Sequence, residues 1–310
     1  MDSETLKEYT KIASYYYKEG MTQDQIARKM SISRPRVNRI IKKCVELGIV
    51  KIEIREIAQD NIDLEKEIEK KFGLKEAVVV EPAENLLESL GKTAARYLEK
   101  VLKDNDVIGF SRGRALSALL DASPSVQKRN LSVVQLVGGN NYNQSENFLK
   151  YDDIIRRASE VLEAESFFLY APTVVTSHEL KESLLKEESF MGMFERIKKC
   201  TVIVVGIGKV LSAKDAKKRS SIAFEDYVKI LERKAVGEVC ARHFDIEGNG
   251  VNGDADLKIM GIEPTDIKKV PLRIGVAGGA EKYEAILGAL RGGYINVLIL
   301  DSVTALRLLE

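Results

Sequence analysis

Residues 1–30 carry apolar side chains at helical spacing. Apolar positions recur every three or four residues over 6–16, and Gly20 follows where such a helix would end. Thr22 is placed to cap a second helix, and Gln25, three residues later, completes the pattern of a capping box. The buried face of the second helix is expected at Ile26, Ala27 and Met30. The pattern predicts two helices separated by a short turn.

A third helix is predicted after a break at 31–33. Ser33 is placed to cap it, and Pro35 falls in the first turn, where its missing amide hydrogen costs nothing. The inner stripe of this helix is expected at Val37, Ile40, Ile41 and Val45. From Ile49 to Arg55 apolar and charged residues alternate, which predicts a short strand or wing that closes the unit.

Residues 61–72 are highly charged, yet Leu64, Ile68 and Phe72 stand at fourth-residue spacing. This pattern predicts a short amphipathic helix that joins two domains. We place the domain boundary near residue 58, which gives an N-terminal domain over 1–58 and a second domain over 59–310. The joining helix is expected within 59–74.

Beyond the boundary, short β-branched runs alternate with helical segments. Strands are expected at 77–80, 107–110, 131–137, 167–170, 202–205, 239–244, 274–277 and 297–300. Helices are expected at 86–102, 115–120 and 283–290. Strands that alternate with helices predict a mainly parallel, doubly wound α/β sheet covered on both faces. In such sheets ligands bind beyond the carboxyl ends of the strands.

Length and composition fit a soluble protein with about two domains, because 310 residues with 45% hydrophobic side chains can fill two cores. No run approaches the roughly 20 apolar residues of a membrane span, and the N-terminal region is too charged for a signal peptide. We therefore expect a cytoplasmic protein with no membrane partner. Three separated cysteines and two histidines predict neither a disulfide framework nor a metal site.

Positive charge is concentrated at the N-terminus. Residues 1–55 hold twelve Lys and Arg against seven Asp and Glu, whereas the rest of the chain holds 36 against 40. Seven basic residues and no acidic one lie between Arg28 and Lys43. Because the apolar stripe of the third helix turns inward, its basic and amide side chains must largely point outward. A helix of this kind fits the DNA major groove, with Arg suited to guanine, Asn to adenine and Lys to phosphate.

The side chains expected to contact DNA come from the start of the second helix and from the third. They are Thr22, Gln23, Ser33, Arg34, Arg36, Asn38, Arg39, Lys42 and Lys43. The alternative is a helical module that binds another protein and whose basic face is only solvated. Two short helices, a three-residue turn and a following strand are more restrictive than a basic patch alone, and they favour DNA.

The run Met21 to Arg39 resembles the helix-turn-helix of the SorC family, the sorbitol-operon regulators of bacteria. The resemblance covers nearly the whole chain. It continues in Ile108-Gly109-Phe110-Ser111-Arg112-Gly113-Arg114, Val137-Gly138-Gly139, Tyr170-Ala171-Pro172, Val205-Gly206-Ile207-Gly208, Val276–Lys282 and Ala289–Tyr294. It implies a winged helix-turn-helix domain and an effector domain that resembles sugar-phosphate isomerases and deaminases in fold. It also implies a phosphorylated sugar as effector and a homo-oligomer, commonly a tetramer.

The strand ends supply candidate effector contacts. Backbone amides, a hydroxyl and a guanidinium follow the strand at 107–110 and precede a helix, a combination that favours an anion. With the turns that carry the resemblance, the expected effector contacts are Gly109, Phe110, Ser111, Arg112, Gly113, Gly138, Gly139, Ala171, Gly206 and Gly208. Asp245 and Lys282 match the family's ligand positions, as an acceptor for sugar hydroxyls and a point charge for phosphate.

Simpler explanations stay open for these residues: Ser111 as a helix cap, and Asp245 and Lys282 as surface salt bridges or caps. Lys92, Lys150 or Lys209 is a candidate for a Schiff base with an open-chain sugar, although reactivity needs a lowered pKa. The pair Gly206 and Gly208 lacks the third glycine of a dinucleotide fingerprint, so no cofactor is expected.

The sequence favours a transcription regulator, and a repressor of a carbohydrate operon is expected. Operator half-sites one helical turn apart require at least a dimer, whose DNA-domain spacing an effector can alter. A sugar-phosphate isomerase or deaminase that carries a DNA-binding domain is the alternative. It is less favoured because turnover needs a carboxylate or His poised over the substrate, and beyond the pair His243 and Asp245 the sequence shows no base–acid constellation.

Overall fold

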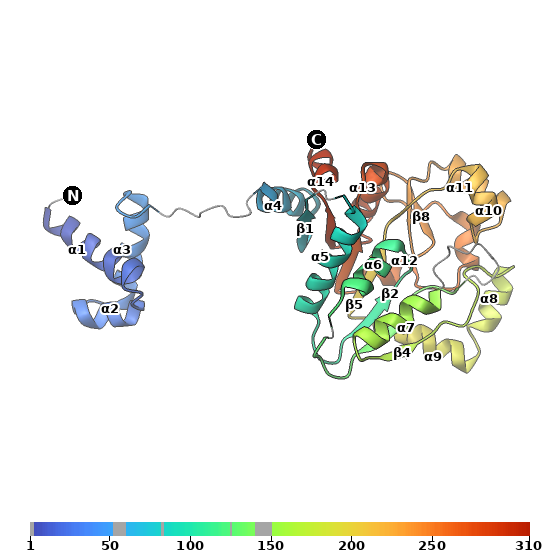
Figure 1. Cartoon of the computed structure of the whole chain (residues 1–310), viewed down its shortest axis with the longest axis horizontal. Coiled ribbons are helices and arrows are strands. Elements are labelled where there is room, and N and C mark those ends of the chain that lie inside the picture. The colour runs from blue at the N-terminus through green and yellow to red at the C-terminus, as the bar shows by residue number, and fades with distance from the viewer. Residues whose placement is uncertain (1–2, 52–59, 82–83, 125, 140–150) are drawn as a thin grey trace. The chain divides into compact units, whose positions relative to one another are not determined.

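The structure is a computed structural model that describes residues 3–51, 60–81, 84–124, 126–139 and 151–310. The chain divides into two compact units, residues 1–57 and 58–310 (Figure 1). No helix among the described residues is long and apolar enough to cross a membrane.

The first unit is a small helical domain. Its elements are α1 (Ser3–Ala13), a π-helical turn η1 (Ser14–Lys18), α2 (Gln23–Met30) and α3 (Arg34–Glu46). Gly20 follows η1 with a φ of +65°, as expected of a helix end. The Thr22 side chain accepts from Gln25 N, and the Gln25 side chain accepts from Thr22 N at 2.8 Å, so the predicted capping box is present.

The structure of this unit differs from the predicted one in two details. Val45 is 40% exposed, whereas Cys44 is buried beside Val37, Ile40 and Ile41. The buried positions thus keep strict three- and four-residue spacing, and Val45 lies one helical step outside that stripe. Ser33 precedes α3 with extended backbone but makes no side-chain cap hydrogen bond.

The predicted wing lies largely outside the described residues. Ile49 and Val50 are half-buried against the core of the first unit, and their backbone forms no strand. Residues 52–55, the remainder of the predicted strand, are not described by the structure.

Within the described residues, the second unit is built on a seven-stranded sheet in the order β1-β10-β9-β5-β2-β3-β4. The strands are β1 (Glu76–Val80), β2 (Val107–Phe110), β3 (Ser132–Gln135), β4 (Glu165–Phe167), β5 (Val202–Gly206), β9 (Leu272–Val276) and β10 (Val297–Asp301). Every pairing in this sheet is parallel, as the alternation of strands and helices predicts.

The second unit contains the helices α4 (Asp60–Phe72), α5 (Leu86–Val101), α6 (Arg114–Ala122), α7 (Tyr151–Val161), α8 (His178–Leu184), α9 (Glu188–Lys198), α10 (Ala213–Arg219), α11 (Phe224–Glu232), α12 (Pro264–Lys269), α13 (Tyr283–Arg291) and α14 (Ser302–Leu309). Helices α10 and α11 pack on each other in a small cluster of their own, and other helices cover both faces of the sheet. Along β5, Ile203 and Val205 belong to one buried cluster, and Val202 and Val204 belong to the other. This alternation shows that both faces are covered by core.

Two predicted strands are wrong in detail. The run 239–244 is not one strand of the parallel sheet. It contributes to two short antiparallel strands, β7 (Gly237–Val239) and β8 (Arg242–Phe244), which form a second sheet with β6 (Gly208–Lys209). Cys240 and Ala241 form the turn with φ of +55° and +63°, and because neither is Gly or Asn, the sequence carries no turn signal there.

The strand expected at 167–170 lies earlier, because β4 ends at Phe167. Leu169 N donates to the side chain of Gln135 in β3 at 3.2 Å, where a ladder bond would go to the backbone of that strand. The chain therefore leaves the sheet just before the turn at Ala171.

Helix α4 belongs to the second unit and covers the edge strand β1. Ile68 is fully buried in the core of that unit. Glu69 Oε1 accepts from Ala77 N at 2.9 Å, and Glu65 Oε1 accepts from Val79 N at 2.8 Å. Two side chains of α4 thus satisfy the outward amides of an edge strand that would otherwise be open to pairing.

Candidate functional site: an anion cleft and a basic helix

A cavity of about 310 Å³ opens at the carboxyl ends of β2, β5 and β9, which are adjacent in the sheet. The loops that follow these strands line it, at 111–115, 206–208 and 276–282. Leucines from the start of α5 close one side, and Glu238 and Cys240 of the β7–β8 hairpin close another. The cavity lies where doubly wound folds bind their ligands.

Ser111 ties two of these loops together. The side chain is 5% exposed, and its Oγ accepts from Gly206 N at 3.1 Å and donates to Arg112 O at 3.3 Å. Ser111 is not the cap of α6, since Gly113 occupies that position. Its hydroxyl therefore fixes the relative placement of the β2 and β5 loops.

The N-terminus of α6 lines the cavity. Gly113, Arg114 and Ala115, the cap and first two residues of this nine-residue helix, are all part of the wall. The first amides of a helix have no partner within it, and the helix dipole places partial positive charge there. This end of the cavity suits a phosphate or carboxylate.

Lys282 adds a cation that is already held in place. Its Nζ donates to Ile207 O at 3.0 Å. Burial lowers the pKa of Lys282 below its usual value, and the charges of Arg114 and Lys209 lower it further against the opposing effect of Glu281. A negatively charged ligand would relieve this repulsion.

A second cavity of about 500 Å³ continues from the first, and seven wall residues are common to both. Lys209 and Arg219 line this second part. Across the two cavities the basic side chains are Arg112, Arg114, Lys209, Arg219 and Lys282, and the acidic ones are Glu238 and Glu281. We call the combined space the cleft. The side chains that line it carry a net positive charge, and the two carboxylates among them can accept hydrogen bonds from hydroxyl groups.

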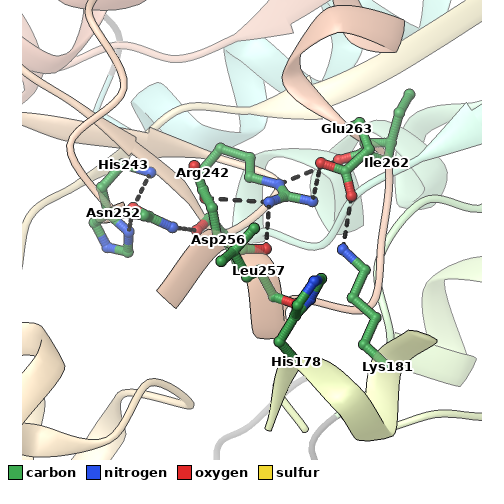
Figure 2. Close-up of polar contacts among 10 residues, drawn as sticks. His178, Lys181, Arg242, His243, Asn252, Asp256, Leu257, Ile262 and Glu263 are labelled. Carbon is green, nitrogen blue, oxygen red and sulfur yellow. Dashed lines mark hydrogen bonds and ion pairs between the residues drawn. The ribbon is translucent and has the colours of Figure 1, made fainter. Parts of the chain in front are cut away.

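A buried ion cluster, shown in Figure 2, holds the hairpin that carries Glu238 and Cys240. Arg242 on β8 is 1% exposed; its Nη1 lies 3.1 Å from Asp256 Oδ1, and its Nη2 lies 3.1 Å from Glu263 Oε2. Lys181 Nζ of α8 donates to Glu263 Oε1 at 2.7 Å. Because Arg242 joins the hairpin to the η2 turn (Gly253–Lys258) and to Glu263, it fixes one wall of the cleft.

Six of the predicted effector contacts line the cleft: Ser111, Arg112, Gly113, Gly206, Gly208 and Lys282. Gly109 and Phe110 are not in its lining. They lie in β2, where Phe110 is buried and a Cβ on Gly109 would come 2.4 Å from Leu136 Cδ2. This glycine serves close packing of the sheet.

Gly138, Gly139 and Ala171 are also absent from the cleft lining. Gly138 packs against the turn that contains Ala171, since a Cβ there would lie 2.5 Å from Ala171 O. Thr173 Oγ1 donates to Gly138 O at 2.7 Å. These residues join the ends of β3 and β4, and Gly139 directly precedes residues that the structure does not describe.

Asp245 is likewise outside the cleft lining. Its Oδ1 accepts from Glu247 N at 3.0 Å and from Asn249 N at 2.9 Å, and its Oδ2 accepts from the Asn249 side chain. The carboxylate closes an Asx turn after β8. The simpler explanation, a local cap, fits Asp245 better than a ligand contact.

The three lysines considered for a Schiff base differ in position. Lys92 pairs with Glu88 on the exposed face of α5, Lys209 lines the second cavity, and Lys150 lies outside the described residues. Two charged residues of the cleft, Glu238 and Arg219, were not predicted from the sequence. Glu238 reaches the cleft through the hairpin turn, which has no sequence signal, and Arg219 ends a run of lysines typical of a solvated helix.

The basic helix of the first unit presents the predicted DNA contacts. Ser33, Arg34, Arg36, Asn38, Arg39, Lys42 and Lys43 are exposed. Two of them are already paired: Arg36 Nη2 lies 3.0 Å from Glu8 Oε1, and Arg34 Nε lies 3.7 Å from Asp24 Oδ1. Thr22 is engaged in the capping box, and Gln23 is half-buried at the start of α2.

Both units match known families. Residues 15–51 match the family model of the winged helix-turn-helix DNA-binding domain, and residues 57–310 match the model described as "Putative sugar-binding domain". The chain is also 32% identical to the sorbitol operon regulator of Klebsiella pneumoniae over 100% of this chain and 99% of that protein. The chain belongs to the SorC family of sugar-binding transcription regulators. A deoxyribonucleoside regulator of Bacillus subtilis is 30% identical and covers 98% of both chains.

Solved structures of SorC-family regulators have the same fold. The full-length sorbitol operon regulator SorC from Klebsiella pneumoniae superposes with a TM-score of 0.73 over 100% of both chains. A probable sor operon regulator from Shigella flexneri is 30% identical, with a TM-score of 0.74 over 81% of this chain and 100% of that one. These relatives are named as regulators, which supports a regulator of transcription and not an enzyme.

Proposed function

We propose that this SorC-family regulator binds operator DNA through α3 and senses a phosphorylated sugar in the cleft of its second unit. The N-terminal domain, near residues 1–58, would hold DNA, and residues 59–310 would bind the effector and form the oligomer. The observation that carries the proposal is the positive cleft at the carboxyl ends of the strands.

A phosphate is the part of the effector that the cleft chemistry supports best. The first turn of α6 offers backbone amides, and Arg112, Arg114 and Lys282 line the same space. A neutral sugar would leave Lys282 in a buried, like-charged setting, whereas a phosphate would compensate its charge. Glu238 and Glu281 would then accept hydrogen bonds from sugar hydroxyl groups.

The exposed face of α3 supports the DNA half of the proposal. Asn38 and Arg39 lie in the second turn of this helix, and Lys42 and Lys43 follow one turn later. We assign base contacts to the Asn and Arg side chains and phosphate contacts to the lysines. We propose that the residues at the N-terminal ends of α2 and α3 contact the DNA backbone. They are Thr22, Gln23, Ser33 and Arg34.

The proposed working form is a homo-oligomer, a dimer or a tetramer, because a two-fold operator needs at least two helix-turn-helix units. The proposed action is repression of a carbohydrate operon, which the protein would carry out in the cytoplasm, where the DNA is. The effector would change operator affinity by binding one arrangement of the oligomer better than another.

The effector half is tested by thermal-shift and calorimetric titration of the full chain with pentose and hexose phosphates, each beside its unphosphorylated sugar. A ligand at 100 times its dissociation constant should stabilise the native state by about 2.7 kcal/mol. We expect such a shift for at least one phosphate and none for its neutral counterpart. Equal binding of the neutral sugar would refute the phosphate assignment, and rapid chemical conversion of any phosphate would favour the enzyme alternative.

A further inference from the structure

Asp301 lies at the carboxyl end of β10, beside the cleft loop that runs from Gly278 to Lys282. The side chain is 3% exposed, and its Oδ2 accepts from Gly279 N at 2.7 Å. The same carboxylate caps α14, because its Oδ1 accepts from Thr304 N at 3.0 Å and its Oδ2 from Thr304 Oγ1 at 2.7 Å. One buried carboxylate therefore holds both a cleft loop and the start of a helix.

The contact between the loop and Asp301 is close. A Cβ on Gly278 would lie 2.6 Å from Asp301 Oδ2 and 3.0 Å from Leu90 Cδ1, so the loop backbone packs directly against the carboxylate. Burial by itself would raise the pKa of Asp301, but the hydrogen bonds from Gly279 and Thr304 hold it below its usual value. The carboxylate is thus ionised and fully engaged, and the loop cannot shift without disturbing it.

Helix α14 contacts the same loop a second time. Arg307 Nη1 lies 3.5 Å from Ala280 O, and its guanidinium stands 4.1 Å from the ring centroid of Tyr283. Ala280 and Tyr283 bracket Glu281 and Lys282, the charged residues that the loop contributes to the cleft. The loop is therefore fixed to α14 on both sides of its ligand-facing residues.

On its other side α14 packs against α4 (Figure 1). Leu308 and Ile68 are buried in one cluster, and Lys71 Nζ donates to Leu309 O at 3.0 Å. Helix α4 is in turn bonded to β1 through Glu65 and Glu69. In sequence, α4 is the first described element after the DNA-binding unit.

We propose that Asp301 is a positioning residue that couples the ligand-facing loop of the cleft to α4, and through α4 to the DNA-binding unit. A ligand that draws Lys282 toward its anionic group shifts the backbone of the loop at Gly279, and the shift reaches α14 through the Asp301 carboxylate. Because α14 and α4 share a buried interface, they move together. This inference rests on the proposed effector site, and it adds the path by which occupancy of that site reaches the rest of the molecule.

The test is hydrogen–deuterium exchange of the full chain, with and without inorganic phosphate or D-fructose 6-phosphate as probe. In the unaltered protein we expect slower exchange over 278–282 and a change of exchange over 60–72 and 302–309. In Asp301→Asn the helix cap is retained, because Asn is also a good cap, but the acceptor for Gly279 N is lost. We expect protection of 278–282 to remain and the change over 60–72 to fall at least about fivefold.

Thr304→Val is the matched control. It removes one hydrogen bond to Asp301 but leaves the bond from Gly279, so the response of 60–72 should persist. Should Asp301→Asn lose its folded circular-dichroism spectrum, Arg307→Met, at an exposed position, carries the same expectation. Protection of the loop with no response of 60–72 in the unaltered protein, or an undiminished response in the tested variant, overturns the coupling alone. Absence of loop protection by either probe overturns the effector site and the coupling with it.

Discussion

Arg36 of α3 donates to both carboxylate oxygens of Glu8 of α1, at 3.0 and 3.2 Å. Both bonds come from Nη2, and they join the proposed recognition helix to the first helix of the domain across its exposed surface. The guanidinium is therefore oriented before DNA binds. To contact a base or a phosphate, it must give up part of its hydrogen bonding to Glu8. Arg39, one turn further along the same exposed face, has no ion pair of this kind among the described residues.

We expect Arg39→Ala to weaken operator binding more than Arg36→Ala. Loss of a base contact should cost about 1–3 kcal/mol, whereas the contribution of Arg36 is reduced by the Glu8 pairing that it gives up. Fluorescence anisotropy with a labelled operator fragment at several salt concentrations measures both. Unchanged affinity in both variants would contradict the assignment of α3 as the recognition helix.

Lys282→Met is expected to remove the response to effector while operator affinity without effector stays within about twofold, because Lys282 lies in the cleft of the second unit. The matched control is Lys103→Met, which removes the same charge from an exposed position away from the cleft lining. Operator titrations with and without the sugar phosphate read out both variants. A normal response in Lys282→Met would move the anion site elsewhere.

Effector binding should also depend on pH through Lys282. Burial lowers the pKa of this lysine below 10.5, and a bound anion would raise it again, so binding takes up protons. Affinity should be full below the lowered pKa and should fall as pH rises through it toward 10.5. Calorimetry in buffers of different ionisation enthalpy measures the uptake, which Lys282→Met should abolish. Net release of protons on effector binding in this pH range would contradict the role assigned to Lys282.

Arg242→Met is expected to destabilise the second unit by about 3 kcal/mol, because it leaves Asp256 and Glu263 without their buried cation. Effector affinity should fall as well, since the hairpin with Glu238 loses its anchor (Figure 2). Arg291→Met, which removes the exposed pair with Glu247, should cost less than about 1 kcal/mol. Urea unfolding of both variants gives the comparison, and equal losses would contradict the role of the cluster.

Local patterns in the sequence predicted the parts of the fold that local forces determine. The Thr22 capping box and the parallel strands of the main sheet were predicted because side-chain spacing and β-branched runs encode them directly. The two-strand hairpin was not, because Cys240 and Ala241 adopt left-handed backbone without the glycine or asparagine that usually marks such a turn.

The residues of the cleft that lie at strand ends were predicted from the sequence. Those that reach the cleft only through tertiary contacts were not. The turns with Ser111 and Gly206 follow their strands in sequence, so topology alone brings them together. Glu238 lies in the cleft only because the antiparallel hairpin sets it against Gly208. Asp245 has the residue type of a sugar ligand, but the amides of Glu247 and Asn249 use its Oδ1 and the Asn249 side chain uses its Oδ2.

The most direct test of the account is the operator affinity of the full chain, measured by anisotropy on DNA from upstream of its own gene. The titration is repeated with each sugar phosphate that stabilises the protein and with the corresponding neutral sugar. We predict that one phosphorylated sugar changes the operator dissociation constant at least about fivefold and that its neutral counterpart leaves it unchanged. A sugar phosphate that binds the cleft tightly yet leaves operator affinity the same would contradict the account.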